Sequence, residues 1–162
     1  MKILGIDPGY AIIGYGIIDT SLPRLVVDYG VITTPKENTL PVRLSNIENA
    51  LISLFETYKP EAVAIEELFY FKNQKTVIPV AEARGVTLLV AQKYCQNIFE
   101  YTPMQIKQAL TGQGRAEKAQ IQFMVKNILG LAQIPKPDDA ADALAVALTH
   151  AQTSPALNTN KI

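Results

Sequence analysis

The first 34 residues contain apolar stretches typical of β-strands, separated by turn residues. Strands are predicted at KILGID (2–7), YAIIGYGIID (10–19) and RLVVDYGVITT (24–34). The connections between them are short and contain Pro and Gly, and such connections are typical of hairpins. We therefore expect the chain to begin with an antiparallel meander of three strands.

The hydrophobic pattern then changes to a helical one. In LPVRLSNIENALISLFETYKP (40–60) the apolar residues recur at helical spacing, and Pro60 ends the predicted helix. Because strand–helix–strand units form parallel strands with right-handed crossovers, we expect an α/β fold with a five-stranded mixed sheet flanked by helices. The remaining predicted elements are a strand at 61–69, helical stretches within 75–94, a strand at 97–102, and helices at 103–110, 116–129 and 138–151.

Composition indicates one soluble globular domain. The 162 residues are 48% hydrophobic and 19% charged, which is ordinary for a single packed domain. We expect that domain to span residues 1–151 and residues 152–162 to form a disordered tail. The lone Cys95 lies in an apolar stretch, which indicates a buried thiol in a reducing compartment. No secretory signal or membrane span is evident, so a cytoplasmic protein is predicted.

Charge balance argues against a protein that coats nucleic acid indiscriminately. Fifteen basic and fifteen acidic residues cancel. The charges are nevertheless segregated along the chain, because residues 101–130 contain four basic residues and one acid. This distribution suits either a focused binding surface or a solvated helix face.

Two acids lie at or near the carboxyl ends of predicted strands. Asp7 is followed by Pro8-Gly9, which is ordinary turn chemistry, and a strand emerging into solvent would equally explain Glu66. However, functional groups collect at the carboxyl ends of strands in open α/β sheets. A carboxylate that is buried there needs a partner or a metal ion, because desolvating it is costly.

Two further acids lie on the last predicted helix. Asp139 and Asp142 are three residues apart, so their Cβ atoms lie about 5–6 Å apart. Like charges at this spacing call for a cation, although acids also favour the first turn of any helix. Alanines surround them and would let the helix pack closely on a sheet. Carboxylate oxygens suit magnesium or manganese, and two such ions about 3.5–4 Å apart would support phosphodiester hydrolysis.

Five stretches carry a resemblance to a known family. They are ILGIDPG, AIEELFYFKN, EARGV, IKQALTGQGRAEKAQI and DDAADALAVALTH, in this order from residue 3 to residue 150. The chain resembles the RuvC Holliday junction resolvases (crossover junction endodeoxyribonucleases) over nearly its whole length. The resemblance implies a ribonuclease H-like fold and a homodimer that cuts four-way DNA junctions symmetrically in recombination and repair. It further implies dependence on Mg²⁺, with Mn²⁺ as a substitute, and a RuvA–RuvB-type branch-migration complex as partner.

The resemblance also assigns roles to individual residues. It places metal binding and catalysis on Asp7, Glu66, Asp139 and Asp142, and phosphate contact and catalysis on Lys107 and Lys118. Asp138 adjoins this set, but the spacing of DAADALA selects Asp139, and no role follows for His150. Phe69 matches an aromatic residue implicated in stacking on bases, although core packing is the ordinary role of a phenylalanine. The weaker candidates for contacts with the DNA backbone are Lys72, Lys75, Arg84 and Arg115.

Other functions fit the sequence less well. An actin-like ATPase needs two such domains, and GQGRAEK (112–118) lacks the ending of a P-loop. A catalytically silent junction-binding protein would not need all four acids. A RuvX-like nuclease acting on ribosomal RNA precursors remains the alternative, and the stretches AIEELFYFKN and DDAADALA favour the junction resolvase over it.

Overall fold

A mixed sheet of five strands organises the described part of the chain. The structure is a computed structural model and describes residues 1–68, 76–153 and 159–162. The strand order is β3-β2-β1-β4-β5, with β1–β2 and β2–β3 antiparallel and β1–β4 and β4–β5 parallel. The predicted α/β fold with a five-stranded mixed sheet is therefore confirmed. The strands are β1 (Lys2–Asp7), β2 (Ile12–Asp19), β3 (Val26–Thr33), β4 (Ala62–Glu66) and β5 (Ile98–Tyr101).

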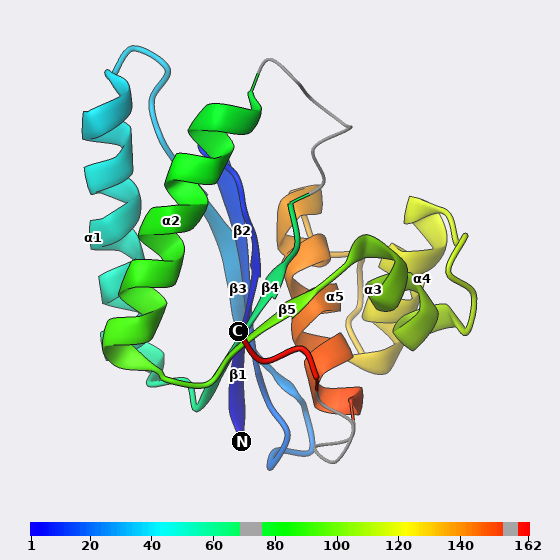
Figure 1. Cartoon of the computed structure of the whole chain (residues 1–162). Helices are drawn as coiled ribbons and strands as arrows, with labels where there is room; N and C mark the ends of the chain where they lie inside the picture. The colour runs from blue at the N-terminus through cyan, green and yellow to red at the C-terminus, as the bar shows by residue number, and fades with distance from the viewer. Residues whose placement is uncertain (69–75, 154–158) are drawn as a thin grey trace.

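Helices cover both faces of the sheet (Figure 1). On one side lie α1 (Leu40–Tyr58) and α2 (Val77–Tyr94), and on the other lie α3 (Pro103–Thr111), α4 (Lys118–Ile128) and α5 (Asp138–Gln152). The start of α4 is later than predicted, because Glu117 is the N-cap and forms a capping box with Gln120. Within the described residues, no helix is long and apolar enough to span a membrane.

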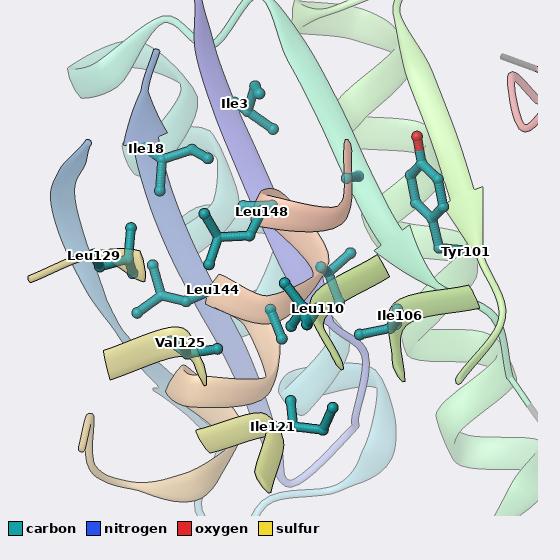
Figure 2. Close-up of a cluster of buried hydrophobic side chains, with 14 of the residues drawn as sticks. Ile3, Ile18, Tyr101, Ile106, Leu110, Ile121, Val125, Leu129, Leu144 and Leu148 are labelled. Atoms are coloured by element: carbon teal, nitrogen blue, oxygen red, sulfur yellow. The ribbon is translucent and has the colours of Figure 1, made fainter. Parts of the chain in front are cut away.

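Two hydrophobic cores, one on each face, hold these layers together. Figure 2 shows Ile3 and Ile18 of the sheet close to Leu144 and Leu148 of α5. Each fully buried side chain of this kind contributes roughly 1.5–3 kcal/mol relative to its exposed state. The second core joins the sheet to α1 and α2, and its largest members are Leu4, Ile6, Ile13, Ile17, Ile47, Leu51, Phe55 and Ile65.

Glycines in β1 and β2 let α5 approach the sheet more closely than any other residue would allow. A Cβ atom added to Gly14 would lie 1.9 Å from the backbone oxygen of Asp139, and one added to Gly5 would lie 2.1 Å from that of Ala143. Both contacts are far shorter than van der Waals distances. The backbone of α5 therefore rests directly on the backbone of these two central strands.

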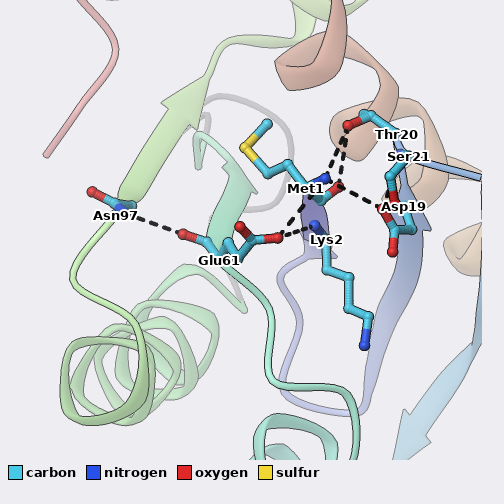
Figure 3. Close-up of polar contacts among 7 residues, drawn as sticks. All are labelled: Met1, Lys2, Asp19, Thr20, Ser21, Glu61 and Asn97. Carbon is cyan, nitrogen blue, oxygen red and sulfur yellow. Dashed lines mark hydrogen bonds and ion pairs between the residues drawn. The ribbon is translucent and has the colours of Figure 1, made fainter.

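A network of charges closes the end of the sheet that holds the start of β1 (Figure 3). The ammonium group of Met1 lies 3.3 Å from Oδ1 of Asp19 and 3.8 Å from Oε2 of Glu61. Hydrogen bonds from the side chain and backbone of Ser21 lower the pKa of Asp19 to about 2, and the ammonium group adds to that effect. The backbone N–H of Lys2 donates to Glu61 at 2.8 Å. These contacts tie β1 to its neighbours β2 and β4.

The last residues of the chain pair with the outer edge of β5. Lys161 forms an antiparallel bridge with Phe99, and the N–H of Ile162 donates to the carbonyl of Ile98 at 3.0 Å. The expectation of a disordered tail is therefore wrong for residues 159–162, while residues 154–158 lie outside the described residues. The physical reason is that β5 is an edge strand, whose free N–H and C=O groups can bind an extended segment of any composition.

We predict that Gly14→Ala destabilises the protein by about 1–3 kcal/mol, because the added Cβ would displace α5 from the sheet. The measurement is the free energy of unfolding from a denaturant titration. Ser45→Ala, at an exposed position of α1 that is far in the sequence from the strand glycines and outside the outer stripe of α2, is the control. In that variant stability should stay unchanged or rise by up to about 1 kcal/mol. Equal stabilities of the two variants would contradict the close-approach account.

Candidate active site

Asp7 and Glu66 lie at the same edge of the sheet because β1 and β4 are parallel neighbours. Ile6 and Ile65 are register partners, and the two acids are the next residues along their strands. Asp7 in turn pairs with Gly14 of β2, whose backbone contacts Asp139 at the start of α5. Three segments that are far apart in the sequence thus bring their acids to one place.

The electrostatics of Asp7 show that these carboxylates interact. Burial raises the pKa of Asp7, and the negative charges of Glu66, Asp142 and Asp139 raise it further, to about 8. The nearby ammonium of Lys118 opposes this shift only in part. In the absence of another cation, Asp7 therefore holds a proton at neutral pH.

Lys118, the first residue of α4, supplies positive charge to this cluster. Its Nζ donates a hydrogen bond of 2.9 Å to Oδ2 of Asp142 and lies 3.6 Å from Oδ2 of Asp138. Burial alone would lower the pKa of Lys118, but the bond to Asp142 and the surrounding carboxylates raise it, so the ammonium form is favoured. Burial raises the pKa of Asp142, and the bond from Lys118 counteracts that effect.

A pocket of about 200 Å³ opens beside these acids. It contains both acidic and basic side chains, because Glu66 and Asp142 line it together with Lys107 and Lys118. The two lysines come from α3 and α4, which pack against α5 through Ile106 and other apolar residues of the core shown in Figure 2. The pocket thus has groups that bind cations next to groups that bind phosphate.

The donor set suits a divalent cation. Carboxylate oxygens are the preferred ligands of magnesium and manganese, and the repulsion that raises the pKa of Asp7 is the kind that a bound cation relieves. Among the described residues, no three Asp, Glu, His or Cys side chains are yet arranged around one common ion position. Asp142 instead faces the ammonium of Lys118. Ion binding would therefore require side-chain rearrangement within the cluster.

Two other predicted DNA-binding residues, Arg84 and Arg115, do not line the pocket beside the acids. Arg84 of α2 forms an ion pair with Glu100 of β5, which joins that helix to the sheet. Arg115 is exposed in the connection between α3 and α4. Three predicted residues, Phe69, Lys72 and Lys75, lie outside the described residues.

The two residues without an assigned role have structural partners. Asp138 accepts a hydrogen bond of 2.7 Å from Lys136, and that bond lowers the pKa of Asp138. His150 lies at the other end of α5, where its Nδ1 is 2.7 Å from the hydroxyl of Tyr101 and its ring packs on Phe99. Burial lowers the pKa of His150, so the neutral form is favoured there. Its position is that of a core residue.

Sequence reasoning missed one polar cluster near the site. Arg43 of α1 is buried beside Thr34 and Tyr10, and Tyr10 belongs to the turn that follows Asp7. A pattern in the sequence could have revealed it. Arg43 precedes Ile47, Leu51 and Phe55 at intervals of four residues, so a charged residue lies on the buried face of a predicted helix.

Comparisons with known proteins show the family and the fold of the chain. The family model described as "Crossover junction endodeoxyribonuclease RuvC" matches residues 3–150. A protein of that name from Petrotoga mobilis is 57% identical over 151 residues, covering 93% of each chain. The structure of Thermus thermophilus RuvC in complex with Holliday junction substrate is 34% identical, with a TM-score of 0.90, and the match covers 100% of this chain and 99% of that one.

A more distant structure shares the fold alone. The yeast mitochondrial Holliday junction resolvase is 15% identical, with a TM-score of 0.65 over 93% of this chain and 77% of that one. The ribonuclease H-like fold expected from the sequence is confirmed by these structural neighbours. Because the family model covers residues 3–150 and relatives above 50% identity align over nearly the full length, this chain belongs to the RuvC family of crossover junction endodeoxyribonucleases.

Proposed function

We propose that this protein resolves four-way (Holliday) DNA junctions by metal-dependent hydrolysis of phosphodiester bonds during recombination and repair. The observation that carries the proposal is the set of interacting carboxylates where the strand ends meet the start of α5. The Thermus thermophilus relative, whose fold matches over the whole chain, was determined with a Holliday junction substrate. The RuvX-like alternative is not favoured, because the family match is to crossover junction endodeoxyribonucleases.

Asp7, Glu66, Asp139 and Asp142 would hold the divalent cations. When bound, such ions would stabilise negative charge on the phosphate that is attacked and would promote ionisation of the attacking water. We propose Mg²⁺ as the physiological ion, two per site, with Mn²⁺ as a substitute. The protein itself contributes a rigid placement of Asp7 and Glu66 on two neighbouring strands, and that placement is independent of which ion binds.

Lys107 and Lys118 would bind the phosphate. Both line the pocket beside Glu66 and Asp142, so a phosphate that approaches the acids comes within reach of two ammonium groups. Exposed Arg115 would contact the DNA backbone further out, and Arg84 would do so only if it left its ion pair with Glu100. Phe69, Lys72 and Lys75 remain proposed DNA contacts from the resemblance alone.

Symmetric cutting of two strands calls for two active sites, and the outer face of α2 offers a surface for a homodimer. Ile78, Ala81, Gly85 and Leu89 are exposed and recur at intervals of three or four residues, so they form one outward stripe. Ile78 is 70% exposed and Leu89 is 54% exposed, which is unusual for residues of this kind on one face of a long helix. Burial of this stripe against a second copy would explain its composition.

The proposed cellular location and the proposed partner complex rest on the family alone. A nuclease for chromosomal junctions would act in the cytoplasm. A RuvA–RuvB-type branch-migration complex would deliver the junction to it.

Cleavage should depend on the structure of the nucleic acid. With Mg²⁺, the wild-type protein should cut a synthetic four-way junction and leave matched linear duplex and structured RNA intact in a gel-based assay. Glu66→Gln should bind the junction with unchanged affinity and cut it at least about 100-fold more slowly, because a charged ligand of the divalent cations is lost.

Glu67→Gln is the matched control for that variant. Glu67 is the next residue but lines a different pocket, near Arg84 and Glu100, so its loss should leave the cleavage rate close to that of wild type. Equal cleavage of all three substrates, cleavage of RNA alone, or normal cutting by Glu66→Gln would contradict the proposed function.

The proposed dimer interface can be tested by a substitution at Leu89. Leu89→Glu should shift the molecular mass in solution from that of a dimer toward that of a monomer, because a charge would be placed in the proposed interface. The mass can be measured by light scattering after size-exclusion chromatography. Leu22→Glu, at a residue that is 46% exposed in the connection from β2 to β3, is the control and should remain dimeric. A monomeric wild-type protein, or a dimeric Leu89→Glu variant, would contradict this interface.

A further inference from the structure

The turn that follows Asp7 is held by residues from two other elements. Residues 8–11 connect β1 to β2, and Thr34 lies directly after β3. The N–H of Thr34 donates to the carbonyl of Ala11 at 3.0 Å, and its hydroxyl donates to the carbonyl of Tyr10 at 2.6 Å. Thr34 thus binds two successive carbonyl groups of the turn.

Arg43, in the first turns of α1, holds Thr34 in that position. A hydroxyl has one proton, and the proton of Thr34 is used on Tyr10, so the hydroxyl oxygen is left to accept. Nε of Arg43 donates to that oxygen at 2.8 Å, and Nη2 reaches the carbonyl of Thr34 at 3.5 Å. The hydrogen bonds therefore run in one direction, from Arg43 through Thr34 to the turn.

A second contact links Arg43 to the same turn directly. Its Cζ atom lies 4.3 Å from the centre of the Tyr10 ring, which is the geometry of a cation–π interaction. The planar guanidinium group can make this contact and the two hydrogen bonds together, whereas a lysine ammonium cannot reproduce the fork. Arg43 is therefore joined to Tyr10 in two ways. One is the pair of hydrogen bonds through Thr34, and the other is the direct cation–π contact.

Burying the guanidinium of Arg43 costs free energy, which indicates that Arg43 has a role beyond packing. Arg43 is only 8% exposed and Thr34 only 7% exposed. The partners described above are a hydroxyl, a carbonyl and a ring, all of them neutral, and a buried guanidinium with neutral partners is poorly compensated for its lost hydration. An apolar side chain on this buried face of α1 would serve stability better.

We propose that Arg43 is a positioning residue for the nuclease reaction, acting through Thr34 and Tyr10 to fix the turn that sets the backbone of Asp7. The backbone of Asp7 is held on one side by its pairing with Gly14 and on the other by this turn. The inference rests on the proposed function, because Asp7 matters only if the acids carry out the reaction. Junction cleavage by the wild-type protein tests that function separately.

The experiment compares variants that remove or keep the hydroxyl. Thr34→Val removes both hydrogen bonds of the hydroxyl at nearly constant shape, and Thr34→Ser keeps the hydroxyl. The single-turnover rate of cleavage is measured at saturating four-way junction and Mg²⁺, with junction affinity measured in EDTA and melting temperature alongside. Thr34→Val and Arg43→Gln should cut about 10–100-fold more slowly with unchanged junction affinity, and Thr34→Ser should cut at nearly the wild-type rate.

Tyr58→Phe is the matched control for lost stability. It removes a hydrogen bond of 2.5 Å to Asp28, which also joins α1 to β3 but lies outside the turn. This variant should melt at a lower temperature and cut at the wild-type rate. Wild-type cutting by Thr34→Val and Arg43→Gln would overturn the proposal. A loss of cutting in Tyr58→Phe equal to theirs would also overturn it, because general destabilisation would then be the cause.

Discussion

The direct contact between the backbone of α5 and the backbones of β1 and β2 is the constraint on which the rest of the structure depends. It exists because Gly5 and Gly14 have no side chains, and because α5 presents alanines to the sheet. The contact fixes the first turn of α5 at the carboxyl end of β1, so Asp139 and Asp142 meet Asp7 and Glu66. The geometry of the site is thus set by the close packing of the core.

This constraint has an electrostatic consequence. The raised pKa of Asp7 comes first from burial and then from the repulsion among the four carboxylates held together. The ammonium of Lys118 relieves part of it through Asp142. A divalent cation would relieve more of this repulsion. It would compete with the ammonium of Lys118 for Asp142. The turn after Asp7 is held from outside the cluster, because the Thr34 hydroxyl donates to the carbonyl of Tyr10 and Arg43 donates to that hydroxyl.

Much of the fold and the acidic set could be predicted from local patterns. The meander, the five strands and the helices follow from hydrophobic periodicity, and the positions of Asp7 and Glu66 at or near strand ends indicate a functional role. What could not be predicted depends on contacts between distant segments. The ion pair of Arg84 with Glu100 and the pairing of residues 159–162 with β5 have no local pattern. The close approach at Gly14 has none either, because a glycine in a strand does not reveal which backbone lies against it.

We propose that the strand ends and the start of α5 build one cation site. The most direct measurement is anomalous diffraction from crystals soaked in Mn²⁺, with metal-free crystals as reference. Anomalous density should appear between Asp7, Glu66 and the carboxylates of α5, with the ammonium of Lys118 moved away from Asp142. Absence of density there at a saturating Mn²⁺ concentration, or density only elsewhere on the molecule, would show that these carboxylates do not form the cation site.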